Sequence, residues 1–318
     1  MASFDSINYS LRPAKSIQQQ LAFEGVRLLD KEIDLKRAMY VGLSSVWFTD
    51  FAMVHRMLGI EDMVSIEKDE IAAARARFNK PFRTVTVKEG MAGEVLDSMY
   101  DDESMNGRPW IVWLDYDDSI NADILDDLKA VIEKAPGDTI LLTTFNGHET
   151  NYGRLVNAGQ QERRSYLSEL FGDAFDETVP QQTLKGARLA ELLCSLTLDK
   201  LQDYATVVGR SGGFAPAFRM IYADGAPMIT VGGVLPTLGD RRRVAGIVAR
   251  EDWPCLLEGS IQAPPLTMLE ALTLQAQHPR AAPLTRDEVR GLGFDLRDDQ
   301  LETFARYYRQ YPTYVKAS

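Results

Sequence analysis

The sequence predicts a doubly wound α/β fold, in which helices cover both faces of a mostly parallel sheet. Five short apolar segments alternate with helix-like segments in the N-terminal half of the chain. This alternation implies right-handed crossovers between parallel strands. The apolar segments also lack the strict polar alternation of strands that have one face in water, as expected for a sheet covered on both sides.

Each of the five predicted strands is a short run of apolar or β-branched side chains, which favour the buried, pleated surface of a sheet. They are residues 37–42, 63–66, 84–87, 109–114 and 139–145. The predicted helices precede or connect them, at residues 16–29, 48–58, 69–78, 92–99 and 121–134.

The pattern changes after the fifth strand. Residues 147–184 are polar and turn-rich, so we expect an insertion or a helical cap there. A long helix is predicted over residues 184–207. Two further strands, 218–222 and 228–231, then flank an Asp-Gly turn and predict a hairpin, with Pro227 at a strand's first position or at an edge.

The composition shifts again after Asp240. Three consecutive arginines follow, at 241–243, and beyond residue 260 prolines break the chain into short helices. The last predicted helix, 301–311, interleaves aromatic and basic residues, a pattern that suits either a docking helix or a base-stacking surface. We therefore divide the chain into a sheet domain, 1–240, and a helical C-terminal region, 241–318.

Composition and charge exclude several classes of protein. The 318 residues are 45% apolar, which excludes a fully disordered chain. Lys and Arg number 35 against 46 Asp and Glu, a net charge of −11. Because non-specific polyanion binding depends on excess positive charge, general coating of nucleic acid is disfavoured.

Cysteine and histidine usage indicates a reducing compartment and no structural metal. Cys194 and Cys255 both lie in apolar surroundings and are too few for a disulfide framework. The three histidines lack metal-ligand spacing, so we predict no structural zinc site of the usual Cys/His kind. The chain begins without an apolar run of signal-peptide length and contains no apolar run of membrane-spanning length. We expect a cytoplasmic protein that does not enter the membrane.

Over residues 36–235, parallel strands and helices followed by an antiparallel hairpin resemble class I S-adenosylmethionine-dependent methyltransferases. The resemblance implies a Rossmann-like, mostly parallel sheet of seven strands with a terminal antiparallel hairpin. It also implies S-adenosylmethionine as cofactor, bound across the carboxyl ends of the first strands, where ligands of open α/β sheets lie. Residues 1–240 are then the methyltransferase-like domain.

The loop after the first strand is the first candidate for cofactor contact. Gly42 stands where the chain must turn sharply, and Ser44 and Ser45 replace the glycines that usually follow in the resembled family. A serine offers a hydroxyl and a helix cap, but its Cβ limits close backbone approach. The alternative is an ordinary strand-to-helix turn with a serine cap.

Glu67, at the end of the second strand, is the stronger candidate. An acid at this position accepts hydrogen bonds from the ribose hydroxyls of a nucleoside cofactor, and it follows the glycine turn by about the expected spacing. The alternative is a carboxylate that caps the next helix.

Asp115, Tyr116 and Asp117 directly follow the fourth strand, at the same predicted edge. In the resembled family this position faces the methyl group and its acceptor. Asp115 or Asp117 would then position or deprotonate the acceptor, while Asp115 and Tyr116 would also contact the cofactor. The alternative is an acidic start to the next helix, with Tyr116 packed in the core.

Three basic residues complete the predicted site. In many methyltransferases an N-terminal segment closes over the cofactor, and Arg12 and Lys15 would then bind a carboxylate or phosphate of the substrate. The alternative is a disordered arm followed by a helix that Ser16 caps. His148 follows the fifth strand, where acid–base catalysis is plausible, although a solvated loop histidine is the simpler interpretation.

The sequence supports three hypotheses of function. The first is an enzyme that transfers a methyl group to an oxygen or nitrogen of an unidentified small-molecule or protein acceptor. The second is a non-catalytic relative used for sensing or assembly, with a protein partner bound through 147–184 or the C-terminal region. The weakest is a nucleic-acid methyltransferase, because the usual base-binding signatures are absent after the fourth strand.

Overall fold

The computed structural model describes residues 12–43, 45–153 and 162–312. Within these ranges the chain forms one eight-stranded sheet in the order β3-β2-β1-β4-β5-β7-β6-β8. Among these eight strands, only β7 runs antiparallel to its neighbours. The strands are β1 (Met39–Leu43), β2 (Met63–Glu67), β3 (Val85–Glu89), β4 (Trp110–Asp115), β5 (Thr139–Asn146), β6 (Ala215–Ala223), β7 (Pro227–Leu235) and β8 (Leu256–Ile261).

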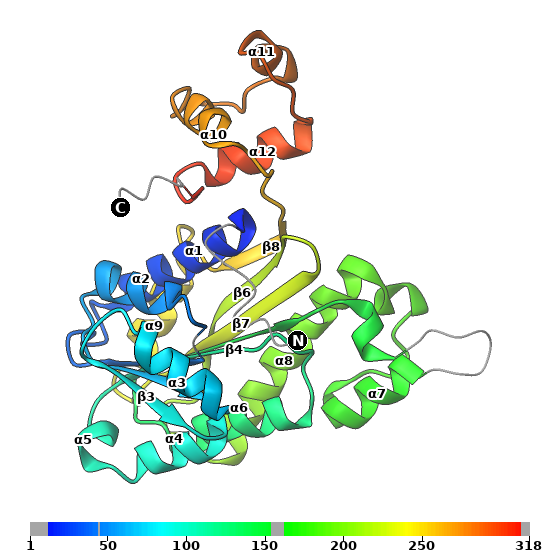
Figure 1. Cartoon of the computed structure of the whole chain (residues 1–318). Helices are drawn as coiled ribbons and strands as arrows, with labels where there is room; N and C mark the ends of the chain where they lie inside the picture. The colour runs from blue at the N-terminus through cyan, green and yellow to red at the C-terminus, as the bar shows by residue number, and fades with distance from the viewer. Residues whose placement is uncertain (1–11, 44, 154–161, 313–318) are drawn as a thin grey trace.

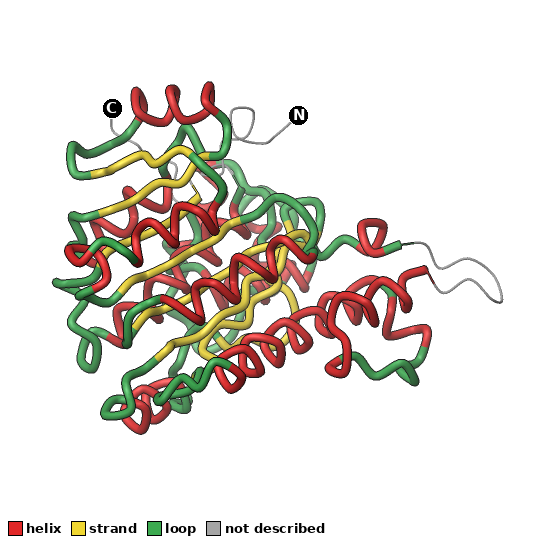
Figure 2. Tube along the Cα trace, turned by 90° about the horizontal axis from the view of Figure 1, so that it is seen from below, coloured by secondary structure: helices red, strands yellow, loops and turns green. Residues whose placement is uncertain are grey.

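Helices cover both faces of the sheet (Figures 1 and 2). One face carries α1 (Pro13–Leu29), α2 (Thr49–Leu58), α3 (Glu70–Asn79) and α9 (Arg241–Val248). The other carries α4 (Ala92–Tyr100), α6 (Ala122–Lys134) and α8 (Gly186–Val207), with the short α5 (Glu103–Asn106) beside α4.

Alternating strand residues supply two separate hydrophobic cores. In β1, Tyr40 packs toward the α1 face, whereas Met39 and Val41 pack toward the α8 face. In β4, Trp113 and Val112 divide in the same way. Because successive side chains of a strand point to opposite faces, both sets must be apolar, which explains the continuous apolar runs in the sequence.

The predicted fold class is confirmed, and the seven predicted strands are all present. Pro227 is the first residue of β7, as expected. The eighth strand, β8, pairs parallel to β6 at the sheet edge. Its sequence, with Glu258 and Gly259 in the middle and mostly exposed side chains, carries no strand pattern. Residues 241–261 therefore form helix α9, which packs on the sheet, and strand β8, which extends it. The helical addition follows β8.

The helical addition comprises α10 (Met268–Gln275), α11 (Arg286–Gly291) and α12 (Asp298–Tyr307), which lie beyond β8 (Figure 1). Phe304 and Tyr311 are buried in it, and the Tyr311 hydroxyl donates to the Pro264 carbonyl at 2.7 Å. Gln310 donates to the Glu24 carboxylate on α1. The aromatic residues of the tail thus hold the helical addition together, and Gln310 joins it to α1.

The segment after β5 forms an arm that projects from the sheet (Figure 2). It contains η2 (Glu149–Tyr152), α7 (Glu162–Phe171), η3 (Gly172–Ala174) and η4 (Gln181–Leu184). Buried Arg163 holds the arm together by donating to the carbonyls of Glu149, Gly153 and Leu184. None of the helices in the described ranges is long and apolar enough to cross a membrane.

Gly25 allows helix α1 to pack closely against the β6–β8 edge of the sheet. A Cβ on Gly25 would lie 2.5 Å from the Cys255 sulfur and 3.4 Å from ring atoms of Phe218 and Trp253. The Cys255 thiol in turn donates to the Leu21 carbonyl at 3.1 Å. Glycine is therefore required here for the helix to approach the sheet.

We expect Gly25→Ala to lower the free energy of unfolding by about 1–3 kcal/mol, because the added methyl overpacks this contact. In urea unfolding, Gly246→Ala on α9 is the matched control, since its Cβ would meet nothing within 4 Å. Adding Cys255→Ala should recover part of the loss. Equal stability of the two single glycine variants would contradict this account of how α1 packs against the sheet.

Candidate active site

A cavity of about 810 Å³ opens at the carboxyl edge of the sheet, a size typical of small-molecule sites. Its lining comes from the N-terminal turns of α1, α2, α4 and α6, the ends of β1, β2, β4 and β5, and the β6–β7 hairpin. The residues are Arg12, Lys15, Gln19, Leu43, Ser45, Thr49, Asp50, Ile66, Glu67, Lys68, Gly90, Met91, Ala92, Asp115, Tyr116, Asp117, Asp118, Asn121, Asp123, Ile124, Asp127, Asn146, Tyr222, Asp224, Gly225, Ala226 and Met228.

Carboxylates outnumber cationic groups in this lining. The acids are Asp50, Glu67, Asp115, Asp117, Asp118, Asp123, Asp127 and Asp224, and the bases are Arg12, Lys15 and Lys68. Because a cleft lined by one sign of charge concentrates the opposite sign, the cavity favours a ligand that carries positive charge.

Parallel pairing brings the predicted acids to one edge. β1 pairs with β2 so that Leu43 faces Ile66, and β4 pairs with β5 so that Asp115 faces Thr144. Glu67, the last residue of β2, is 8% exposed and lines the cavity beside apolar Ile66. The cavity therefore combines a buried carboxylate with apolar walls at the β2 end.

An ion pair between a buried lysine and a partly exposed aspartate joins α1 to the end of β4. The Lys15 ammonium lies 2.5 Å from Asp115 Oδ2, and the two side chains are 4% and 28% exposed. The same nitrogen lies 5.5 Å from the ring centroid of Tyr222. Burial acts to lower the pKa of Lys15, but attraction to Asp115 and Tyr222 outweighs it and raises the pKa above its usual value. Lys15 is therefore a fixed positive charge in the cavity.

The β6–β7 turn fixes the start of α1. Asp224 accepts the backbone N–H of Ala14 through Oδ1 at 2.9 Å and that of Lys15 through Oδ2 at 2.8 Å. The Asp224 carboxylate thus accepts two of the backbone N–H groups that have no partner within the helix. The N-cap residue, Arg12, makes no capping hydrogen bond with its side chain. This anchoring holds the N-terminus of α1 at the cavity wall.

A second polar pair lies at the β1 end of the cavity. The Tyr40 hydroxyl donates to Asp50 Oδ2 at 2.5 Å. Burial and the Asp115 charge raise the pKa of Asp50 to about 6, although the hydrogen bond from Tyr40 acts in the opposite direction. Burial also raises the pKa of Tyr40 well above its usual value. Gly42 leaves room for this phenol, because a Cβ there would lie 3.1 Å from the Tyr40 oxygen.

The backbone before Asp50 is strained. Phe48 is the N-cap of α2 with φ 47°, in the left-handed region that non-glycine residues rarely adopt. Its ring is buried 5.1 Å from that of Phe51. Packing thus maintains a turn that costs on the order of 1–3 kcal/mol and directs the first turn of α2, with Asp50, into the cavity.

Tyr116 and Asp117 both line the cavity after β4. The Tyr116 hydroxyl donates to Asp127 Oδ2 on α6 at 2.7 Å, and burial raises the pKa of both groups. Tyr116 therefore presents its ring to the cavity while its hydroxyl is engaged. Asp117 is exposed at the cavity mouth.

The structure brings most of the predicted site residues to this cavity. Arg12, Lys15, Ser45, Glu67, Asp115, Tyr116 and Asp117 line it. Gly42 lies within β1 and does not line it; a Cβ at this position would crowd the Tyr40 ring. His148 does not line it either, being exposed and capping η2. Ser44 lies outside the described residues.

Sequence reasoning missed Asp50, Tyr222 and Asp224 as cavity residues. Asp224 had a signal, because the Asp-Gly turn of the predicted hairpin lies at the carboxyl edge. Asp50 resembles any acid in the first turn of a helix. Its partner, Tyr40, lies in an apolar strand, so the sequence predicts a core residue rather than a hydrogen-bond donor to the cavity.

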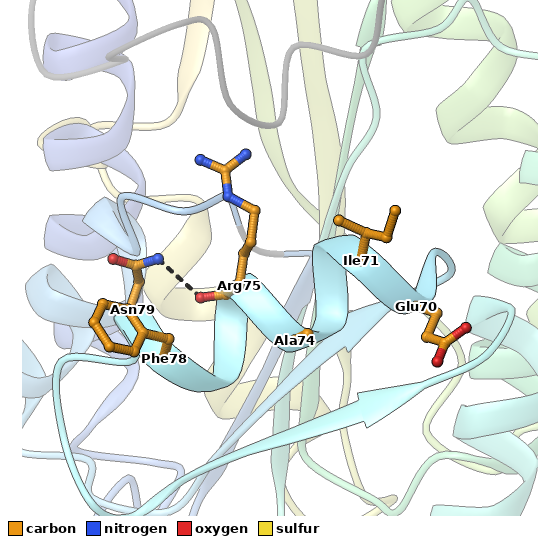
Figure 3. Close-up of a pocket in the computed structure, with 6 residues that line it drawn as sticks. All are labelled: Glu70, Ile71, Ala74, Arg75, Phe78 and Asn79. Carbon is orange, nitrogen blue, oxygen red and sulfur yellow. Dashed lines mark hydrogen bonds between the residues drawn. The ribbon is translucent and has the colours of Figure 1, made fainter.

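No group of three His, Cys, Asp or Glu side chains in the described part of the chain is arranged to hold a metal ion. A hollow on the outer surface of α3 is lined only by that helix, including Ile71 and Phe78, which are 72% and 89% exposed (Figure 3). It gathers no polar groups from separate elements, so the acid-lined cavity is the candidate active site.

The strand order, the antiparallel hairpin and a ligand-sized cavity at the carboxyl edge are those of the class I S-adenosylmethionine-dependent methyltransferase fold. The chain belongs to the family described as "Putative O-methyltransferase", whose model matches residues 7–318. No curated protein has a significant match to the chain.

Several solved structures are similar to the chain. Trm1 from Pyrococcus horikoshii, in complex with S-adenosyl-L-methionine, is 12% identical with a TM-score of 0.46; the match covers 73% of this chain but 58% of that one. An S-adenosylmethionine-dependent methyltransferase from Mesorhizobium loti is 14% identical, with a TM-score of 0.38 and coverage of 68% and 99%. At these values neither bears on the activity of this chain.

The Asp50 carboxyl should leave a pH signature in stability. Its pKa is higher in the folded protein than in the unfolded chain, so the folded state binds the proton more tightly. The stability gained from the protonated carboxyl is present near pH 4 and is lost as pH rises through about 6. The amide that replaces this carboxyl in the Asp50→Asn variant does not titrate in this range.

We therefore expect the stability of Asp50→Asn, relative to wild type, to rise between pH 4 and 6 by on the order of 1–3 kcal/mol and then level off. Urea unfolding at a series of pH values measures this difference. A difference that does not vary with pH would contradict the raised pKa of Asp50.

Proposed function

We propose that this protein transfers a methyl group from S-adenosylmethionine to an oxygen atom of an acceptor bound in the acid-lined cavity. The observation that carries the proposal is the ion pair of buried Lys15 with Asp115 at the end of β4, in the same cavity as buried Glu67. Membership in the O-methyltransferase family supports oxygen as the acceptor atom.

The residues of the cavity fit the cofactor. Glu67 would accept hydrogen bonds from the ribose hydroxyls, with Leu43, Ile66 and Met91 as apolar walls for the adenine. The acidic lining suits a cofactor that carries an ammonium and a sulfonium group, and Arg12 offers a partner for its carboxylate. When bound, the cofactor supplies a methyl group on positively charged sulfur.

The Lys15–Asp115 pair supports removal of the acceptor proton. Asp115 would accept the proton of the acceptor hydroxyl, while the Lys15 ammonium stabilises the negative charge that develops on the oxygen. Asp117 offers a second carboxylate at the cavity mouth. Because α1 is held by Asp224, these groups are fixed before the substrate binds, and this fixed orientation lowers the entropic cost of reaction.

The acceptor and the partners are proposed only as classes. We propose a small-molecule or protein acceptor. The arm over 147–184 and the helical addition after β8 are candidate surfaces for a protein partner, because both project from the sheet (Figure 1). The buried free thiols Cys194 and Cys255 support a reducing compartment, so we place the protein in the cytoplasm.

Cofactor binding is tested by calorimetry with S-adenosylmethionine. We expect micromolar affinity for the wild type and a loss of about tenfold or more for Glu67→Gln, because a charged hydrogen-bond acceptor is removed. Glu70→Gln is the matched control, being an exposed acid at the start of the next helix. Absence of binding to the wild type at about 100 µM protein would contradict the proposed function.

Methyl transfer is tested with labelled S-adenosylmethionine and panels of phenols, carboxylic acids and proteins. On any acceptor that is labelled, we expect Asp115→Asn to lower kcat by about 10²–10⁴-fold while cofactor affinity changes little, because the proton acceptor is lost. Asp126→Asn, an exposed acid on α6 that does not line the cavity, serves as the control. Transfer to nitrogen alone, or full activity of Asp115→Asn, would argue against this role.

A further inference from the structure

The proposed chemistry leaves one polar pair of the cavity without a task. Asp50 lines the cavity from the first turn of α2, and Tyr40 donates to its Oδ2 at 2.5 Å. The Tyr40 ring is fully buried, 5.0 Å from the ring of Phe51 and 6.4 Å from that of Phe23. Tyr40 is thus held rigidly, and it fixes the direction in which the Asp50 carboxylate points.

The charges that face this carboxylate leave an excess of negative charge. Tyr40 faces it from β1, Asp115 from β4, and Lys15 from α1 through its bond to Asp115. Arg12 lines the cavity at the N-terminus of α1. The other charged lining residues are Glu67, Lys68, Asp117, Asp118, Asp123, Asp127 and Asp224. Asp50 and Asp115, which are both partly buried, therefore have one ammonium between them, that of Lys15.

We propose that Asp50, oriented by Tyr40, is the cation-binding residue of the cavity: its carboxylate holds a positively charged group of the cofactor and releases a proton when the cofactor binds. The inference rests on the proposed function, since it assigns a residue to one part of the same ligand. The positively charged group is the ammonium or the sulfonium of S-adenosylmethionine.

Binding and ionisation are coupled because a cation favours the charged form of the acid. With a pKa of about 6 in the free protein, Asp50 is largely protonated one pH unit lower. A ligand that requires the carboxylate then has about a tenfold lower affinity at pH 5 than at pH 7.5. At pH 6, saturation with such a ligand releases about half a proton per molecule.

Three ligands distinguish the two cations. S-adenosylmethionine carries both, S-adenosylhomocysteine carries only the ammonium, and 5′-methylthioadenosine carries neither. Calorimetry at pH 6 in two buffers with different enthalpies of ionisation counts the released protons. Release with the first two ligands assigns the ammonium, and release with the first alone assigns the sulfonium. Release with 5′-methylthioadenosine, or with none of the three, overturns the proposal.

Two variants separate this role from a structural one. Asp50→Asn should abolish proton release and weaken S-adenosylmethionine binding at pH 7.5 by about tenfold or more, while 5′-methylthioadenosine binding changes less than about twofold. Tyr40→Phe keeps the carboxylate but removes a hydrogen bond that lowers its pKa. We therefore expect proton release to persist in Tyr40→Phe, with the pH midpoint of affinity shifted upward.

The outcomes also separate the two proposals. If the folded wild type binds none of the three ligands, the proposed function fails. If S-adenosylmethionine binds with the same affinity to wild type and Asp50→Asn and releases no proton, the assignment of Asp50 fails while the proposed function stands. If the Asp50→Asn variant does not fold, two measurements still test the assignment of Asp50. They are the number of protons released by the wild type and the pH midpoint of affinity of Tyr40→Phe.

Discussion

The contact between buried Lys15 and Asp115 constrains the rest of this molecule. An ammonium that is almost fully buried must have a partner, since losing one member of a buried ion pair costs about 3–5 kcal/mol. The contact ties a helix that precedes the sheet in sequence to the end of a central strand. Asp224 then fixes the first turn of that helix, and Gly25 allows its middle to approach the sheet edge. In this position, the N-terminal end of α1 forms one wall of the cavity at the carboxyl edge of the sheet.

The same constraint explains the electrostatics of the cavity. Because the Lys15 ammonium is bonded to Asp115, the side chain that donates to Asp50 is the neutral Tyr40 hydroxyl rather than a cation. The Asp50 carboxyl therefore has a raised pKa, and the cavity is suited to a cationic ligand. The strained turn at Phe48 serves the same arrangement, since it delivers the first turn of α2 to the cavity.

Much of the sheet could be predicted from the sequence, because buried strands and amphipathic helices have distinct local patterns. The position of Glu67 and Asp115 at the cavity edge was also predictable, since each directly ends an apolar strand. β8 was not, because an exposed edge strand with a central glycine shows no such pattern. Asp50 was missed because its role depends on Tyr40, and the packing of that ring over Gly42 is visible only in three dimensions.

The most direct test of the central claim is a crystal structure of the protein with S-adenosylmethionine. The account predicts the ribose hydroxyls within hydrogen-bonding distance of Glu67 and the methyl group directed toward the Lys15–Asp115 pair. A cofactor bound outside the acid-lined cavity, or one whose ribose is held by other residues while Glu67 remains free of it, would contradict the account.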